Sequence, residues 1–226
     1  MLPEPRRRPR GLRIVVGILT ALLSLGALYG VEVFFHRTSA EERQLLSAAP
    51  AAGTAAGCTA LREVPPYPGG NDRTHIGGTI PRMPPLSTYP SIPPTSGPHN
   101  PVPLAAGVYR SPPPIDRAVH SLEHASVIVW FAPGAAHDPE VARIETFFDR
   151  SGERNHLIVA PYDYPSSGAA GRLPAGREMA LVAWHRLQLC DRPSLAVAYA
   201  FAHSFRFDLW QPTAYRGVAP ERLSPI

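Results

Sequence analysis

The chain has 226 residues, enough for one good-sized domain with an additional tail or anchor. Its hydrophobic content of 44% is ordinary, but 28 prolines and 18 glycines restrict how much of it can form regular structure. Five arginines and two acids precede residue 36, so most of the formal net charge of +4 lies there and the rest of the chain is close to neutral. Nucleic-acid binding needs a basic patch on the folded part, so we expect no nucleic-acid partner.

An uncharged apolar segment, residues 14–31, follows a short tail that contains five arginines, Arg6, Arg7, Arg8, Arg10 and Arg13. As a helix it would be about 27 Å long, close to the roughly 30 Å thickness of the hydrocarbon core of a membrane. We therefore predict a transmembrane anchor over residues 14–35 and membrane lipid as a partner. Because positively charged tails stay inside, the tail 1–13 is predicted to be cytoplasmic and everything after the anchor extracytoplasmic.

Two other interpretations of this segment were weighed. A cleavable signal peptide would have a shorter apolar stretch followed at once by a small-residue cleavage site, whereas Glu32, His36 and the pair Glu41–Glu42 follow here. A lipoprotein would use the cysteine at position 58, which lies too far from the apolar segment. An uncleaved single-pass anchor is favoured.

Residues 36–57 are predicted to form a stalk or linker, with a short helix over residues 41–48, because the Ala/Gly/Pro sequence after it has no periodic apolar face. An extracytoplasmic domain is expected over residues 58–210 and a C-terminal tail over 211–226. Cys58 and Cys190 lie near the two ends of this domain, and outside the membrane such a pair favours a disulfide. A redox or metal–thiolate role is less favoured because the chain has no CxxC motif.

More than half of the prolines lie between residues 65 and 114, so this part must consist mostly of loops and extended segments. It is expected either to carry function or to wrap the core as a belt. Regular structure is predicted after residue 125, as strands over 126–131, 157–160 and 179–189, a helix that begins at Pro139 and a helix over 194–207. The fold class is α+β, with a small sheet, two covering helices and a proline-rich loop belt.

The side chains best suited to chemistry are His99, His120, Glu123 and His124, which lie within 26 residues. Neutral imidazole is a common ligand of zinc and copper, and a carboxylate completes or orients such a set. A helical turn would bring His120 and His124 to one face, whereas a strand would hold them about 13 Å apart. We therefore predict a metal site only if residues 120–124 are helical, with His99 and His75 as further ligands and copper or zinc as the metal.

Several segments of the chain resemble a family of membrane-anchored bacterial proteins, the domain-of-unknown-function family 3105. The matching residues are Cys58, Asp72 with His75-Ile76, the sequence PPTSGPH ending at His99, the sequence HSLEH over 120–124, Ala160-Pro161-Tyr162, and Ala183-Trp184 with Cys190. The family pattern has an aromatic residue at Asn100, Asn at Ser121 and Gly at Ala125. The resemblance implies an anchored extracytoplasmic domain but no activity.

Alternatives to a metal site remain open at the level of sequence. The histidines could instead cross-link proline-rich loops in a non-catalytic envelope interaction module, whose protein partner the sequence does not reveal. The string His120-x-x-Glu123-His124 also occurs in zinc peptidases, but there it lies within a long helix, so a metal-dependent hydrolase is the third hypothesis. Whether the protein is an enzyme is undecided. The other histidines, among them His137, His156 and His185, are scattered and are expected to be ordinary surface or core residues.

Overall fold

The structure is a computed structural model that describes residues 10–35, 39–150, 155–209 and 211–226. It divides into an N-terminal unit and a compact unit that begins at Ala40 and extends to Ile226. The N-terminal unit contains one long helix, α1 (Arg10–Phe35), and most of the predicted cytoplasmic tail lies outside the described residues. Within α1, Ile14–Val31 has a mean hydropathy of 2.2 and buries none of its surface against the rest of the protein. Its length and composition are those of a helix that can cross a membrane.

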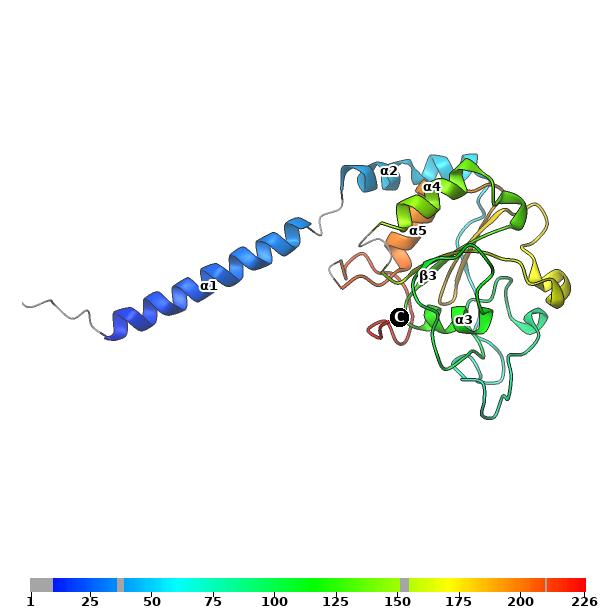
Figure 1. The fold of residues 1–226 in the computed structure, drawn as a ribbon, viewed down its shortest axis with the longest axis horizontal. Helices are drawn as coiled ribbons and strands as arrows, with labels where there is room; N and C mark the ends of the chain where they lie inside the picture. Colours follow the sequence, from blue (N-terminus) through cyan, green and yellow to red (C-terminus); the bar gives the residue numbers. More distant parts are fainter. Residues whose placement is uncertain (1–9, 36–38, 151–154, 210) are drawn as a thin grey trace, which may run out of the picture. The chain divides into compact units, whose positions relative to one another are not determined.

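The compact unit is built on one mixed sheet of six strands (Figure 1). The strands are β1 (Arg62–Glu63), β2 (Gly107–Val108), β3 (Val127–Phe131), β4 (Leu157–Pro161), β5 (Met179–Ala183) and β6 (Arg186–Cys190). Their order across the sheet is β1-β6-β5-β3-β4-β2. The central strand β3 pairs parallel with β4 and antiparallel with β5. All five residues of β3 and of β4 are buried, because both faces of the sheet are covered.

Three helices cover one face of the sheet (Figure 1): α2 (Ala40–Ala55), α4 (Pro139–Phe148) and α5 (Leu195–Phe205). The sequence signals of α4 act as predicted, because the Asp138 side chain accepts a hydrogen bond from the Glu140 N–H and Pro139 occupies the first turn. Ile144 and Phe148, on the buried face of α4, lie in one core cluster with Val129 of β3.

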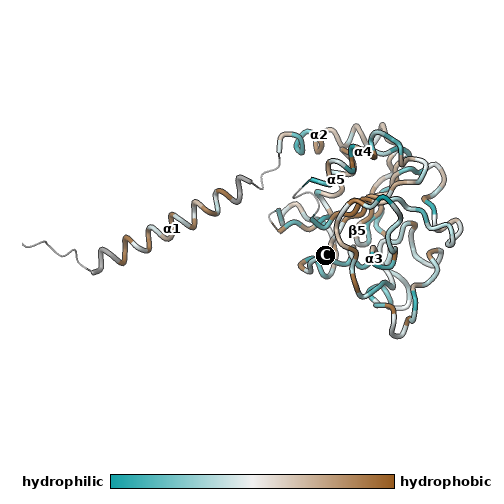
Figure 2. The backbone as a smooth tube through the Cα atoms, viewed as in Figure 1, coloured by the Kyte–Doolittle hydropathy of each residue, from teal (hydrophilic) through white to brown (hydrophobic). Residues whose placement is uncertain are grey.

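The opposite face of the sheet is covered by α3 (Ile115–Glu123) and by loops, with short 3-10 turns at Leu86–Thr88 and Pro165–Gly171, while a third such turn, Pro133–Ala135, packs through Ala135 into the first core cluster. Trp130 and Ile158 of the sheet contact Leu122 of α3 and Leu86 and Tyr89 of the loops within a second core cluster. Figure 2 shows that, within the compact unit, hydrophobic residues are concentrated in the sheet between the two layers. The predicted α+β class is confirmed, with the loop belt packed on the face opposite α4 and α5.

The predicted long strand over residues 179–189 is wrong, because this segment forms a hairpin of β5 and β6. The chain reverses at Trp184–His185, and His185 takes the left-handed backbone conformation with φ 58°. Neither Gly nor Asn marks this turn, so the usual sequence signal for a two-residue hairpin is missing.

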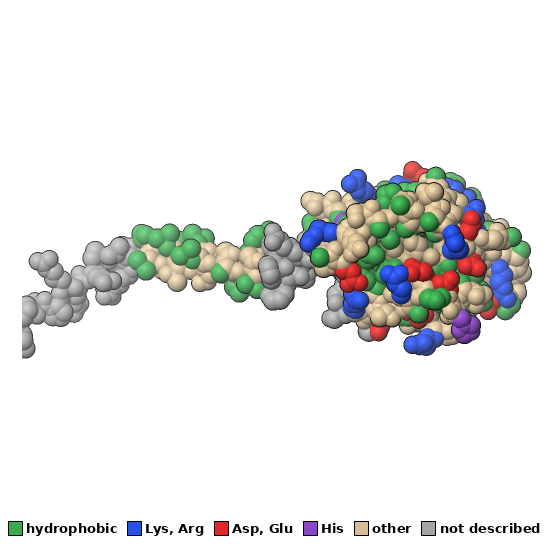
Figure 3. Space-filling view, turned by 90° about the horizontal axis from the view of Figure 1, so that it is seen from above, with side chains coloured by type: hydrophobic (Ala, Val, Ile, Leu, Met, Phe, Trp, Pro, Cys, Tyr) green, Lys and Arg blue, Asp and Glu red, His purple; other side chains and the backbone are tan. Residues whose placement is uncertain are grey.

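Helix α2 occupies much of the segment for which we predicted a linker. Leu45 and Leu46 of α2 pack against the cluster formed by α4, α5 and the sheet. The Cys58 and Cys190 sulfur atoms are 2.07 Å apart, at disulfide distance, and join the segment after α2 to the end of β6. On the face drawn in Figure 3, acidic and basic side chains of this unit are interspersed rather than gathered by sign.

Candidate metal centre

Helix α3 ends inside the predicted site. The N–H of Ser126 bonds to the Ser121 carbonyl and the N–H of Ala125 to the Leu122 carbonyl, the pair of bonds that closes a Schellman motif. Ala125 provides the left-handed residue of this motif, with φ 61°. The motif places the turn that contains His120 and His124 directly before β3. Residues 120–124 are therefore helical, as the metal hypothesis requires.

A loop carries His99 over the end of α3. The backbone of His99 pairs with the neighbouring segment through the bonds from the Ile76 N–H to the His99 carbonyl, 2.8 Å, and from the His99 N–H to the Thr74 carbonyl, 3.0 Å. Gly97, at φ 118°, permits this path, because a Cβ there would lie 2.7 Å from a ring carbon of Tyr89. The two segments bring His75 and His99 side by side, with ring centres 5.0 Å apart.

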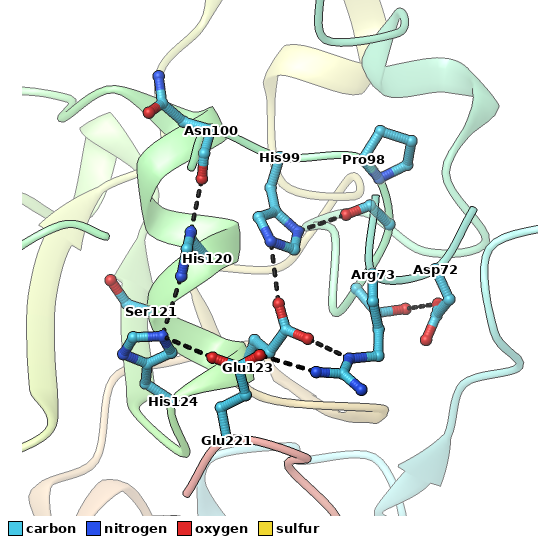
Figure 4. A network of polar contacts seen from close by, with 12 residues as sticks. Asp72, Arg73, Pro98, His99, Asn100, His120, Ser121, Glu123, His124 and Glu221 are labelled. Carbon is cyan, nitrogen blue, oxygen red and sulfur yellow. Dashed lines mark hydrogen bonds and ion pairs between the residues drawn. The ribbon is translucent and has the colours of Figure 1, made fainter. Parts of the chain in front are cut away.

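The hydrogen bonds of three imidazoles fix where their protons lie (Figure 4). The Nδ1 atoms of His99, His120 and His124 lie 2.7, 2.6 and 2.8 Å from the backbone carbonyl oxygens of Gly97, Asn100 and Pro225. Because a carbonyl oxygen only accepts, each Nδ1 carries a hydrogen, and in the neutral ring Nε2 keeps a free lone pair. Such a backbone bond to the outer nitrogen is the usual way in which a metal-binding histidine is oriented.

The Nε2 atoms of His120 and His124 face each other at 2.9 Å. In two neutral rings whose protons are on Nδ1, this contact places two lone pairs together. Burial lowers the pKa of His120, and the nearby His99, His124 and His75 rings lower it further, which outweighs the bond to the Asn100 carbonyl. The His120 ring is therefore neutral at neutral pH, and a proton between the two nitrogens is disfavoured.

Glu123 is buried with 1% of its side chain exposed and lies between His99 and Arg73. Its Oε1 accepts a hydrogen bond from the Arg73 guanidinium, and its Oε2 lies 3.0 Å from Nε2 of His99. Burial opposes ionisation of Glu123, but the His99 ring and the Arg73 guanidinium outweigh it, so the pKa of Glu123 lies below its usual range. His99 Nε2 and Glu123 Oε2 are both buried and make no aligned hydrogen bond. Two such atoms in contact are suited to a shared cation.

The donor atoms form two overlapping groups, in each of which all of them lie within 4.8 Å of one another. One group contains His75, His99, His120 and Glu123, and the other contains His120, His124 and Glu221. His120 belongs to both. Apart from the exposed His75 and the half-exposed Glu221, these side chains are buried. The residues that could hold a metal ion thus include all five that the sequence suggested.

Sequence reasoning missed two members of this cluster, Arg73 and Glu221. Glu221 lies in the predicted C-terminal tail, where no spacing or motif relates it to the histidines. Its Oε1 lies 2.8 Å from Nη2 of Arg73, and its Oε2 lies 3.4 Å from Nε2 of His124. Arg73 stands in a segment that the family pattern includes, but an arginine between two glutamates cannot be inferred from positions 50 and 148 residues apart.

Two further histidines also have partners that the sequence does not indicate. His185 donates from Nε2 to Asp72 Oδ2 at 2.9 Å and from Nδ1 to the Val64 carbonyl at 2.9 Å. His156 lies with Nε2 3.1 Å from the Ser224 carbonyl oxygen. Both residues bond to segments next to the cluster, and neither belongs to a donor group.

The described surface hollows lie elsewhere. One, of about 260 Å³, is lined by α4 with Glu41 and Leu195, and another, of about 420 Å³, lies between α2 and α5. Both are on the helical side of the sheet, and no residue of the histidine cluster lines either one. Helix α3 spans 9 residues before β3 follows, unlike the long helix of the zinc peptidases.

Comparison with known proteins gives one match. The family model described as "Protein of unknown function (DUF3105)" matches residues 85–216, which is more than half of the chain and includes His99, His120, Glu123 and His124. No curated protein and no solved structure matches the chain.

Proposed function

Given that the chain belongs to the DUF3105 family, whose description names no activity, we propose from its own residues that it binds a transition-metal ion, copper or zinc. The ligands are drawn from His99, His120, His124 and Glu123, with His75 at the exposed side. One observation carries the proposal: three imidazoles have their Nδ1 protons committed to backbone carbonyls, which leaves each Nε2 facing another donor atom of the cluster. A cation among these atoms removes the repulsion between His120 and His124.

The distances are compatible with direct binding after small shifts. Imidazole nitrogens at about 2.0–2.1 Å from a tetrahedral zinc ion are about 3.3 Å apart. Here His120 and His124 Nε2 are 2.9 Å apart, and His99 Nε2 and Glu123 Oε2 are 3.0 Å apart. No thiolate is available to the set, since the Cys58 and Cys190 sulfurs lie at disulfide distance from each other. Imidazole with carboxylate suits Zn(II) and Cu(II).

The deciding measurement is the metal content of the full chain, purified in detergent, after equilibration with Zn(II) or Cu(II) and removal of excess ion. Wild type is expected to retain about one ion per chain or more, and His120→Ala/His124→Ala to lose at least tenfold in affinity, because two buried nitrogen ligands are removed. His137→Ala is the matched control, since His137 is exposed and belongs to neither donor group. Equal, sub-stoichiometric metal in wild type and the double variant would overturn the proposal.

The same experiment separates the second candidate, a non-catalytic envelope module with structural histidines. The hydrogen bonds of His99, His120 and His124 to three loop carbonyls are the observation that favours it. In that case added metal would leave the unfolding midpoint unchanged, while the double variant would still unfold more easily. A metal that binds the native state raises the midpoint with the logarithm of its concentration once that concentration exceeds Kd.

We further propose that α1 anchors the protein as a single transmembrane helix, with the N-terminus cytoplasmic and the compact unit extracytoplasmic. The 18 apolar residues Ile14–Val31 and the arginines that precede them support this orientation. The cysteine pair at disulfide distance is also in keeping with an oxidising compartment.

A further inference from the structure

We propose that the C-terminal segment 219–226, the C-terminal strap, closes over the metal centre and supplies Glu221 as an additional ligand. This inference rests on the proposed function, and it concerns how the ion enters, is held and leaves. Glu221 belongs to one of the two donor groups, with His120 and His124. The strap would therefore be part of the site rather than a tail.

The strap contacts the site directly (Figure 4). The N–H of Glu221 bonds to the Glu123 carbonyl at 3.1 Å, and the Pro225 carbonyl accepts from Nδ1 of His124 at 2.8 Å. The Glu221 carboxylate lies between Nη2 of Arg73, at 2.8 Å, and Nε2 of His124, at 3.4 Å. The Pro225 carbonyl thus fixes the proton position on His124, and the Glu221 carboxylate covers the nitrogen that would bind metal.

His75 stands at the exposed side of the cluster, and an ion that goes on to the buried donors must displace a covering segment. His99, His120 and Glu123 are 0%, 3% and 1% exposed. Two segments cover them, the strap and the loop over residues 72–76.

The loop is the firmer of the two covers. It bonds to the His99 segment through the backbone at 2.8 and 3.0 Å, and the Gly97 N–H adds a bond to the Asp72 carbonyl at 2.9 Å. Asp72 is held further by Ser96 at 2.6 Å and His185 at 2.9 Å. The bonds to Ser96 and His185 join the loop to residues that belong to neither donor group.

The strap is held mainly by the site itself. Its contacts are to Glu123, Arg73 and His124, with two further bonds, one between Nε2 of His156 and the Ser224 carbonyl and one from the Ala219 N–H to the Tyr215 hydroxyl at the start of the strap. Ala219 is buried, but Leu223 is 74% exposed and adds little apolar anchoring. Because fewer contacts independent of the site hold the strap, it is the segment that opens.

Opening and ion release are then coupled. Lifting the strap removes a carboxylate donor and frees the Nδ1–H of His124, so the open state binds the ion less well than the closed state. By the same linkage, a bound ion favours the closed strap, because it attracts the Glu221 carboxylate that otherwise pairs with Arg73. Arg73 provides the alternative partner that holds Glu221 in place while the ion is absent.

The first test measures the rate at which a strong chelator in excess removes Zn(II) from the loaded full chain in detergent. Glu221→Gln keeps the size of the side chain but removes its charge, and it is expected to release zinc at least about tenfold faster than wild type. Leu223→Ala, in the same strap but exposed, is expected to release zinc at the wild-type rate. Equal rates for Glu221→Gln and wild type would overturn the role of Glu221.

The second test follows trypsin cleavage after Arg222, which is exposed in the strap, by mass spectrometry. Zinc is expected to slow this cleavage several-fold, whereas cleavage after Arg110, exposed in a loop after β2, should not change. If zinc binds but cleavage after Arg222 is the same with and without it, the strap does not close on the ion. If wild type binds no zinc or copper, the proposed function fails first and the strap has no ion to hold.

Discussion

Asp72 and His185 form a polar pair that holds the loop next to the histidine cluster. Burial disfavours the charged form of Asp72, but hydrogen bonds from His185, Ser96 and the Tyr67 N–H outweigh it and lower the pKa of Asp72. Burial likewise opposes the charged form of His185, but the bond to Asp72 outweighs it and raises the pKa of His185 above 6.5. Each group therefore favours the charged form of the other.

The pair predicts a pH window for stability. The contribution of Asp72, whose folded pKa is lowered, is present above its ordinary value of 3.8 and is lost as pH falls through the folded pKa. The contribution of His185, whose folded pKa is raised, is complete below 6.5 and is lost as pH rises through the folded pKa. Both contributions are therefore present together between pH 3.8 and pH 6.5.

We expect Asp72→Asn to lower the free energy of unfolding by about 1.5–3 kcal/mol at pH 5.5, the usual range for hydrogen bonds to charged groups, and by clearly less at pH 8.5. Urea unfolding of residues 40–226 at the two pH values measures this. Asp191→Asn is the control, since Asp191 is exposed and pairs with Arg177 at the surface rather than with a histidine. A cost of Asp72→Asn that is equal at both pH values would contradict the charged pair.

The individual site residues show what sequence reasoning can find. His120, Glu123 and His124 were predictable because they occupy one helical turn, where spacing alone decides that the side chains meet. His99 was suggested by its motif, but its position over α3 depends on a backbone pairing with Thr74 and Ile76. Glu221 was not predictable, because it reaches His124 through a long-range fold contact that no local pattern encodes.

At the level of elements, the end of α3 determines where His124 lies. The Schellman motif needs a left-handed residue at position 125, and Ala125 adopts φ 61° while 1% exposed. The family pattern has Gly at this position, which takes this conformation without cost. For a non-glycine residue the left-handed conformation costs roughly 1–2 kcal/mol.

We expect Ala125→Val to destabilise residues 40–226 by at least about 2 kcal/mol, because a β-branched residue adds to the backbone cost and overpacks a buried position. Ala125→Gly should stay within about 1 kcal/mol of wild type, since the relieved conformation offsets the lost buried methyl group. Urea unfolding checks both, and metal content shows whether His124 remains in place. A Val variant as stable as wild type would mean that the motif does not constrain this turn.

The elements also differ in how well sequence predicts them. Strand β3 and helix α4 follow from a β-branched apolar run and from the Asp138–Pro139 start signal, both of which act locally. The β5–β6 hairpin was missed because neither Gly nor Asn marks its turn, where His185 takes a left-handed conformation that is uncommon for a non-glycine residue. That turn is stabilised instead by the tertiary bonds of His185 to Asp72 and Val64.

For the whole molecule, the order of the arginines, the apolar helix and the cysteines along the chain indicates on which side of the membrane the histidine cluster lies. The arginines precede Ile14–Val31, and Cys58 and Cys190 follow it, 132 residues apart. A disulfide that closes such a long loop stabilises a fold by up to about 5 kcal/mol in the chain-entropy model, but it persists only in an oxidising compartment. The proposed orientation places the compact unit in that compartment.

We therefore predict that protease added outside intact bacterial spheroplasts removes residues 40–226, while a cytoplasmic marker protein stays whole until the cells are lysed. In the same cells Cys58 and Cys190 should resist alkylation until a reductant is added, because their sulfurs are joined. Moving the arginines from before α1 to after it should invert the protein, since the distribution of positive charge sets orientation. A compact unit that is protected in intact spheroplasts and has reactive thiols would place the histidine cluster in the cytoplasm, and its metal would then come from the cytoplasmic pool.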